Sequence, residues 1–476
     1  MACLIVPAVA LVLFGPRMDD GVPADRVVVD YWEKWTGHEE EQMRELVDEF
    51  NATVGAEKKI FVRYVSTSSI QQKTLIATSA GVPPDVAGLW DSNLAQFAST
   101  NALLPLDEMA AAHGITESTY KPAYWRACHI NGKLYSLIST PAAVALHYNK
   151  KAFHDNAAAL RAAGLDPDRA PQSIDELDAY SKVLEKRTPS GAIASAGYMP
   201  LEPGWYTVAT CAYFGGRLWD PATNKITLTD PAVVKAYEWV QSYSRRLGKD
   251  AVGEYRSSLG NMDSPQNPFL SGTLLMEQQG PWMANYIRTL KPSMTGDRAE
   301  DCDWAAAPFP SALPGGKQTA VLMFDALVIP RGAKHPAEAF EFIAWINQQK
   351  NMERLCTLHC KNSPLAAVSK EFLTKHPNPY IAVFEQLAST PDAYTVPQIP
   401  IWAEVDDELA TMTQRLTLQN VDARVALQES QDRLQAKFDK YLEKRRARGD
   451  QAALAQSLEQ LTASAGDSRD TKAVHP

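Results

Sequence analysis

The stretch VVVDYW at Val27–Trp32 opens the part of the sequence that decides the fold. Its continuous apolar character predicts a buried strand, and TGHE at Thr36–Glu39 then has the spacing of a helix N-terminal capping box. A second strand is expected at Ile60–Val65, a helix at Ile70–Ala80, and a turn and third strand at Pro83–Trp90. Strands that alternate with helices in this way predict an α/β fold with right-handed crossovers and a mainly parallel sheet.

The loops that follow these strands are the expected ligand site. In an open parallel sheet the ligand crevice lies beyond the carboxyl ends of the strands. The loops at residues 32–36, 66–69 and 90–93 should therefore gather on one edge. The same alternation continues downstream, with a second capping box at Ser173–Glu176 and a helix opened by Pro231 and closed by Gly248.

Length and composition limit the possible classes of protein. A chain of 476 residues predicts two or three compact units. Hydrophobic residues at 45% and charged residues at 22% are ordinary for globular proteins, which excludes collagenous and disordered chains. The net charge of −9 comes without a long basic run, so the electrostatic footprint of a nucleic-acid-binding protein is missing.

Both ends of the sequence differ from its middle. The apolar run Leu4–Phe14 is too short to cross a membrane as a helix and suits the central region of a signal peptide, so residues 1–24 are interpreted as a leader. Cys3 leaves a membrane-anchored lipoprotein open as the alternative. Residues 442–476 are interpreted as a flexible tail, in which Leu454, Leu458 and Leu461 could form a short surface helix.

The cysteines argue against a disulfide framework. Without the leader, five remain, at positions 128, 211, 302, 356 and 360, and an odd number cannot pair completely. Cys356, His359 and Cys360 have a spacing that could place three metal ligands on one helical face. Because no second cluster supplies a fourth ligand, a small buried face or a local disulfide is favoured, and no metal or cofactor is predicted.

No strong catalytic motif is present. The nucleophile elbow, the zinc-protease helix motif and the glycine-rich nucleotide loops are all missing from the sequence. Glu39 and Asp91 could in principle flank a glycosidic bond, but a helix cap and a hydrogen-bonding loop acid are the simpler interpretation. The sequence therefore predicts no catalytic residues.

Tryptophan is the informative residue type. Of 11 tryptophans, several lie beside Gly, Pro or polar residues and outside periodic apolar runs, namely Trp32, Trp35, Trp90, Trp205, Trp282 and Trp402. Aromatic faces with polar neighbours suit the apolar faces and hydroxyl edges of a pyranose ring. Trp282 follows Gly280 and Pro281 at a predicted junction between a strand at residues 273–278 and a helix, which makes it the strongest candidate for stacking.

Short motifs follow one another in a fixed order from about Val27 to Tyr441. They are YW at 31–32, GVPPDV at 81–86, LLPLD at 103–107, NGKLY at 131–135, ALHYNK at 145–150, FGG at 214–216, FLSGT at 269–273, GPW at 280–282, APFP at 307–310, DALVIP at 325–330 and AFEF at 339–342. Each is weak alone. Their order and spacing resemble the extracellular solute-binding proteins of ABC sugar importers, the group of the maltose- and glycerol-phosphate-binding receptors.

This resemblance implies a two-lobe periplasmic-binding-protein fold, with each lobe a mainly parallel sheet flanked by helices. The N-terminal lobe would comprise residues 25–140 plus 325–363 and the C-terminal lobe residues 141–324 plus 364–441. A hinge of three crossing segments would join them, near residues 138–142, 320–325 and 362–365. Together with the loop tryptophans, the resemblance points to ten ligand-binding residues: Trp35, Thr36, Ser68, Ser69, Trp90, Asp91, Trp205, Trp282, Asp325 and Trp402.

The implied function is capture of a sugar or polyol-like solute outside the cytoplasm by lobe closure, followed by delivery to the transmembrane subunits of an ABC permease. The expected protein is a periplasmic or extracellular monomer that is not an enzyme and has no nucleic-acid partner. Two alternatives stay open: a carbohydrate-active hydrolase with a Trp-lined cleft, and a receptor for a non-sugar solute such as a glycerophosphodiester.

Overall fold

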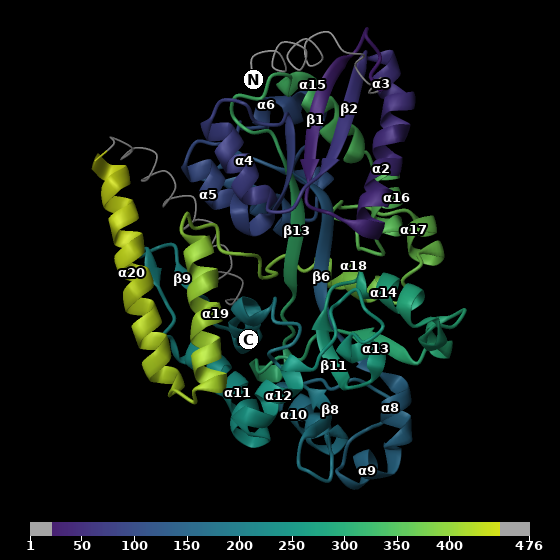
Figure 1. Ribbon diagram of the computed structural model, residues 1–476, viewed down its shortest axis with the longest axis vertical. Helices are drawn as coiled ribbons and strands as arrows, with labels where there is room; N and C mark the ends of the chain where they lie inside the picture. Colours follow the sequence, from purple (N-terminus) through teal and green to yellow (C-terminus); the bar gives the residue numbers. More distant parts are fainter. Residues whose placement is uncertain (1–20, 448–476) are drawn as a thin grey trace, which may run out of the picture.

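One large sheet runs through the whole molecule and joins an upper and a lower half (Figure 1). The computed structural model describes residues 21–447. In spatial order the strands are β2 (Ile60–Ser66), β1 (Val27–Glu33), β3 (Val86–Trp90), β13 (Val321–Val328), β6 (Leu137–Asn149), β11 (Leu274–Gln279), β8 (Ile193–Tyr198) and β7 (Lys186–Arg187), and β12 (Trp304–Ala307) also pairs with β6. Two small two-stranded sheets join β9 (Trp219–Asp220) to β10 (Lys225–Ile226) and β4 (His129–Ile130) to β5 (Lys133–Leu134).

The sheet is mixed. The expected parallel pairs are present, because β1 pairs in parallel with both β2 and β3, and β11 with β8. The two long central strands β6 and β13 instead run antiparallel to each other and to their outer neighbours β11 and β3. A strand that leaves one half and a strand that returns to it must have opposite directions, and the edge strand β7 is also antiparallel to β8, so the parallel arrangement is confined to the β2–β1–β3 group and the β11–β8 pair.

Helices cover the sheet in both halves (Figure 1). The upper half carries α2 (Gly37–Ala52), α3 (Val54–Glu57), α4 (Ile70–Ser79), α5 (Leu94–Ser99), α6 (Asp107–Ala112), α7 (Pro122–Ala127), α15 (Pro336–Ile346) and α16 (Gln349–Leu358). The remaining helices are α8 (Lys150–Asp155), α9 (Ala157–Ala162), α10 (Ile174–Leu184), α11 (Pro231–Leu247), α12 (Lys249–Ser257), α13 (Pro268–Ser271), α14 (Met283–Leu290), α17 (Lys370–Lys375), α18 (Ile381–Ala388), α19 (Trp402–Leu418) and α20 (Ala423–Ala447). No helix within residues 21–447 is both long and apolar enough to cross a bilayer.

Of the two predicted capping boxes, the Ser173 cap forms and the Thr36 cap does not. At α10 the Ser173 side chain accepts a hydrogen bond from the backbone N–H of Glu176, as predicted. At α2 the helix begins directly after Thr36, but the Thr36 side chain makes no capping hydrogen bond. The position of the helix is thus correct and the proposed cap is wrong, because the Thr36 side chain lines a cleft instead.

The segments predicted as hinge crossings lie side by side. Two of them are parts of the paired strands β6 and β13. The third packs against the first, since the backbone N–H of Ala143 donates to the Asn362 side-chain oxygen at 2.9 Å. Three separate pieces of chain therefore form one connection between the halves.

Two hydrophobic cores flank this connection. The upper core packs β1, β2 and β3 against α2, α15 and α16, and the lower core packs β8 and β11 against α10, α11, α19 and α20. Phe269, Met283 and Phe384 belong to the upper core although the sequence analysis assigns them to the C-terminal lobe. The apolar interior therefore does not divide at the residues where the chain crosses the hinge.

The five cysteines of the described chain are free and buried. Cys356 contacts the sulfur of Met352, whereas Cys360 contacts the Asn285 side chain, so the alternative of a local disulfide is wrong and the small buried face holds. No cluster of metal-ligating side chains occurs among residues 21–447. Burial raises the pKa of Cys128, Cys211 and Cys360 to about 12, which keeps these thiols protonated.

The C-terminal boundary needs a correction. Helix α20 continues to Ala447, beyond the predicted start of the tail at position 442, because Leu442 is buried in the lower core together with Leu434 and Phe438. Residues 448–476 and the predicted surface helix at Leu454–Leu461 lie outside the described residues, as do residues 1–20 of the predicted leader.

A glycine in β8 tests the packing of the lower half. A Cβ added to Gly197 would lie 2.5 Å from the Cα atom of Ser181 in α10, and backbone cannot move aside as a flexible side chain can. We expect Gly197→Ala to lower the free energy of unfolding by about 1–3 kcal/mol. The matched control is Gly253→Ala in α12, where the nearest atom is 3.9 Å away and alanine should stabilise the helix by up to about 1 kcal/mol. Urea denaturation of both variants measures the difference, and equal midpoints would contradict the tight packing.

Candidate functional site

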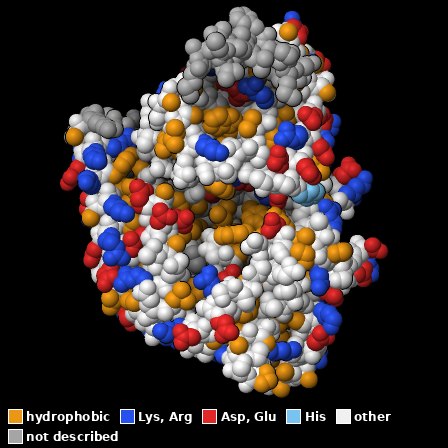
Figure 2. Space-filling model, in the orientation of Figure 1, with side chains coloured by type: hydrophobic (Ala, Val, Ile, Leu, Met, Phe, Trp, Pro, Cys, Tyr) orange, Lys and Arg blue, Asp and Glu red, His pale blue; other side chains and the backbone are white. Residues whose placement is uncertain are grey.

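A cleft of about 660 Å³ lies where the two halves meet. Hydrophobic side chains gather across the middle of the face seen in Figure 2, between the upper and lower halves. The volume suits a small-molecule ligand. The cleft is lined by Lys34, Trp35, Thr36, Glu39, Trp90, Asp91, Thr140, Ala142, Trp205, Tyr206, Met262, Trp282, Tyr286, Met323, Phe324, Asp325 and Lys361.

Sheet topology brings these residues together. The parallel strands β1 and β3 both end at the cleft, so the segments that follow them place Lys34–Thr36 and Trp90–Asp91 at one edge. Asp325 of β13 pairs directly with Trp90 of β3 on one side and with Thr140 of β6 on the other. The central strands therefore carry polar side chains to the same edge.

Four indoles border the cleft, two from each half. Trp90 and Trp205 are 44% and 49% exposed, which is unusual for so large an apolar side chain. Trp35 is almost fully buried at 9% exposed, and Trp282 lies partly exposed immediately before α14. Trp282 lies at the junction between β11 and α14, as its sequence context predicts.

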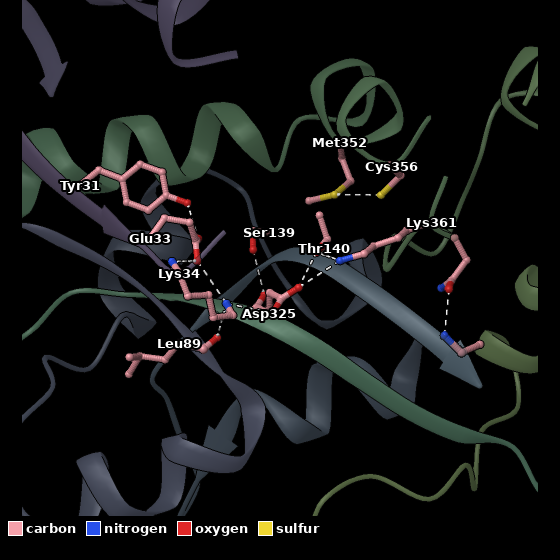
Figure 3. Close-up of polar contacts among 12 residues, drawn as sticks. Tyr31, Glu33, Lys34, Leu89, Ser139, Thr140, Asp325, Met352, Cys356 and Lys361 are labelled. Atoms are coloured by element: carbon pink, nitrogen blue, oxygen red, sulfur yellow. Dashed lines mark hydrogen bonds and ion pairs between the residues drawn. The ribbon is translucent and has the colours of Figure 1, made fainter. Parts of the chain in front are cut away.

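An ion-pair network forms the polar part of the cleft (Figure 3). Lys34 Nζ lies 2.9 Å from Asp325 Oδ1, Lys361 Nζ lies 3.2 Å from Oδ2, and the Thr140 hydroxyl donates to Oδ2 at 2.7 Å. Burial alone would raise the pKa of Asp325, but the two ammonium groups outweigh burial and hold this pKa well below its usual range. The carboxylate therefore stays ionised at every pH at which the protein would work.

A second buried carboxylate supports Lys34. Glu33 accepts hydrogen bonds from the Tyr31 hydroxyl at 2.6 Å and from the Lys34 backbone N–H at 2.7 Å, and its Oε1 lies 3.2 Å from Lys34 Nζ. Burial acts to lower the pKa of Lys34, but the carboxylates of Asp325 and Glu33 outweigh it and raise this pKa. The Glu33 carboxylate occupies the space that a side chain at position 88 would fill, because a Cβ on Gly88 would lie 1.9 Å from Oε2.

Asp91 differs from the other two acids because it forms no ion pair within residues 21–447. Its Oδ1 accepts a hydrogen bond from the Ser92 backbone N–H at 2.8 Å, while Oδ2 has no partner among the described residues. Burial raises the pKa of Asp91 to about 7, against the opposing effect of the Ser92 hydrogen bond, and the nearby charge of Asp325 adds to the rise. The side chain lines the cleft, and its Oδ2 is available to accept a hydrogen bond from a ligand.

The cleft gathers seven of the ten residues that the sequence analysis proposed: Trp35, Thr36, Trp90, Asp91, Trp205, Trp282 and Asp325. The other three lie elsewhere. Ser68 and Ser69 are exposed at the start of α4, and Ser69 has a left-handed backbone with φ of 56°. Trp402 is buried in the lower core at the first residue of α19.

Sequence reasoning missed the two lysines of the network. Lys34 lies between Glu33 and Trp35, so it could have been found as part of the loop after the first strand. Lys361 directly precedes the predicted third crossing, but no motif marks it. Thr140 and Met323 lie inside predicted crossings to which no ligand role was given, while Tyr206, Met262 and Tyr286 come from segments whose approach to the cleft only the fold reveals.

The raised pKa of Asp91 predicts a pH-dependent stability. The folded protein holds this proton more tightly than the unfolded chain, so the contribution of Asp91 is most favourable below about pH 4 and declines as pH rises to about 7. Relative to Asp91→Asn, the free energy of unfolding of the wild type should fall by up to roughly 1.4 kcal/mol per pH unit over that range. Urea titrations at pH 5, 6, 7 and 8 measure this slope. Asp250→Asn, at an exposed position of α12, should run parallel to the wild type, and parallel curves for Asp91→Asn would refute the buried acid.

Comparison with known proteins identifies the family. Residues 36–353 match the family described as bacterial extracellular solute-binding protein. Among solved structures, CpMnBP1 with mannobiose bound shares 25% identity at a TM-score of 0.73, covering 86% of this chain and 99% of that chain. The sugar-binding protein MalE from Xanthomonas citri shares 21% sequence identity at a TM-score of 0.70, and the match covers 89% of this chain and 100% of MalE. UgpB from Mycobacterium tuberculosis in complex with glycerophosphocholine shares 20% identity at a TM-score of 0.66, and the match covers 87% of this chain and 99% of UgpB. The search of curated proteins finds no match. The family match spans well over half of the sequence and agrees with the two-lobe fold, so this chain belongs to the bacterial extracellular solute-binding proteins.

Proposed function

We propose that this protein binds a saccharide in the cleft and serves as the extracytoplasmic substrate-binding component of an ABC importer, which delivers the sugar to a membrane permease. One observation carries the proposal: four indoles from both halves border a single cleft that also contains ionised and neutral hydrogen-bonding side chains. Such a surface matches a sugar ring, which presents apolar C–H faces and hydroxyl edges. The family is extracellular, so this role lies outside the cytoplasm.

The comparisons support a sugar more than other solutes. CpMnBP1 was solved with mannobiose and with mannotriose, and other similar structures hold tagatose, cycloalternan or acarbose. UgpB with glycerophosphocholine represents the non-sugar alternative. In the present cleft both lysines already face carboxylates and no arginine from residues 21–447 lines the wall, which disfavours a phosphodiester.

The mechanism is a population shift between open and closed arrangements of the two halves. Trp35 and Trp90 belong to the upper half, and Trp205 and Trp282 to the lower half. A sugar that contacts indoles from both halves gains these contacts together only when the halves approach, so binding favours the closed state. Such a receptor requires no chemical step.

Trp282 tests the stacking surface. Replacing it with alanine removes an aromatic face of the cleft and should weaken saccharide binding by roughly 5- to 150-fold, the equivalent of about 1–3 kcal/mol for aromatic stacking. Calorimetry with mannobiose, mannotriose, tagatose, acarbose and glycerophosphocholine identifies the probe, and the probe that binds the wild type is then titrated into the variant. Trp125→Phe is the control, because this ring packs on Tyr120 and His129 outside the cleft. If no probe binds the wild type, the proposed function is wrong.

Turnover separates the receptor from the hydrolase alternative. Glu39 and Asp91 both line the cleft, so the two carboxylates that a glycoside hydrolase would need are present. We expect stoichiometric binding of the same oligosaccharides with no released product over many hours, and weaker binding in Asp91→Asn because its amide no longer accepts as a carboxylate does. Steady release of monosaccharide by the wild type that Asp91→Asn abolishes would establish the enzyme instead.

A further inference from the structure

Lys361 joins the separate crossing segments at the floor of the cleft. Its ammonium donates to the Thr140 hydroxyl of β6 at 2.7 Å and to the Asp325 carboxylate of β13 at 3.2 Å (Figure 3). Lys361 itself lies between α16 and the third crossing. One side chain therefore contacts both central strands from the remaining segment of the connection.

One N–H group of the Lys361 ammonium has no oxygen acceptor among the described residues. A lysine ammonium has three N–H groups, and the acceptors found for Lys361 within residues 21–447 are two. The other two buried lysines have three acceptors each. Those of Lys34 are Glu33 Oε1, Asp325 Oδ1 and the Leu89 carbonyl, and those of Lys121 are Glu385 Oε2 and the carbonyls of Ser363 and Leu365.

The unused donor belongs to a side chain that lines the cleft. The Lys361 side chain is only 7% exposed, and its nitrogen lies 5.6 Å from the ring centre of Trp35 and 5.4 Å from that of Trp282. These indoles come from opposite halves. Both rings attract the ammonium as cation–π partners but are weaker acceptors than an oxygen, and a ligand oxygen between them would accept the third N–H.

Charge balance defines the kind of oxygen. Lys34 and Lys361 face Glu33 and Asp325, so two ammonium groups meet two carboxylates and leave no excess positive charge for an anion. Asp91 and Glu39 line the same cleft and add acidic groups. The acceptor that fits this balance is a neutral oxygen, either a hydroxyl or a ring oxygen.

We propose that Lys361 is a specificity-determining residue, which donates its third N–H to a hydroxyl or ring oxygen of a neutral saccharide and so links ligand recognition directly to the hinge. This inference rests on the proposed function. It adds a residue, its ligand atom type and a preference for uncharged sugars over phosphodiesters.

The test uses Lys361→Gln and Lys361→Met. The glutamine amide has two N–H groups, enough for Thr140 and Asp325 but none for a ligand, while methionine removes all donors at similar size. The probe is mannobiose, or the panel saccharide that binds the wild type most tightly, together with its monodeoxy analogues and its carbasugar analogue, in which CH2 replaces the ring oxygen. Both variants should bind the parent sugar about ten- to hundredfold more weakly than the wild type. One of these analogues should bind the wild type more weakly by the same factor and should lose no further affinity on the variants.

The control is Lys150→Met, which removes a lysine outside the cleft and the hinge whose ammonium donates to the carbonyls of Ala299 and Glu300. It should lower the unfolding temperature and leave saccharide affinity within about twofold, so a general loss of stability is distinguished from lost recognition. Equal affinity in Lys361→Gln and the wild type would refute the inference and leave the proposed function standing. A uniform loss for every analogue would also refute it, because a purely structural lysine affects all hydroxyls alike. If no panel member binds the wild type, the proposed function fails and this inference fails with it.

Discussion

The Asp325 carboxylate accepts from two ammonium groups and one hydroxyl, and these three donors come from the loop after β1, from β6 and from the segment after α16. Removing either lysine would leave a buried charge uncompensated, which typically costs several kcal/mol. Because Asp325 also pairs with Trp90 and Thr140 in the sheet, the same residue fixes the floor of the cleft and the alignment of the central strands. Site geometry and hinge geometry thus depend on one ionised group.

The cleft divides recognition between two kinds of surface. The indoles supply broad apolar faces that tolerate different sugars, whereas the network supplies directional groups whose positions are set by the backbone pairing of the strands. Glu33 extends the network into the upper core through Tyr31, and this is possible only because Gly88 has no side chain. The polar floor is therefore held by ion pairs and hydrogen bonds, while Trp90 and Trp205 at its border leave almost half of their surface exposed.

Local patterns in the sequence were sufficient for the strands and helices of residues 27–90, for the strand and helix that flank Trp282, and for α11 with its Gly248 cap. They were also sufficient for the family, whose motifs are local. They were insufficient where a role depends on long-range pairing: the lysine at position 361 contacts residues more than thirty positions away, and nothing in its neighbours signals this. Ser68 and Ser69 lie in a loop and Trp402 is the first residue of α19, and tertiary packing, which local sequence does not show, keeps all three out of the cleft lining.

The five buried thiols have a consequence for a protein that acts outside the cytoplasm, where disulfides form readily. In the native state burial shields all five from oxidants and raises the pKa of Cys128, Cys211, Cys356 and Cys360, which keeps these four protonated. An unfolded chain has no such protection, so its thiols could pair with one another or with those of a second molecule. After export the chain must therefore bury its sulfur atoms in the hydrophobic cores before they are oxidised.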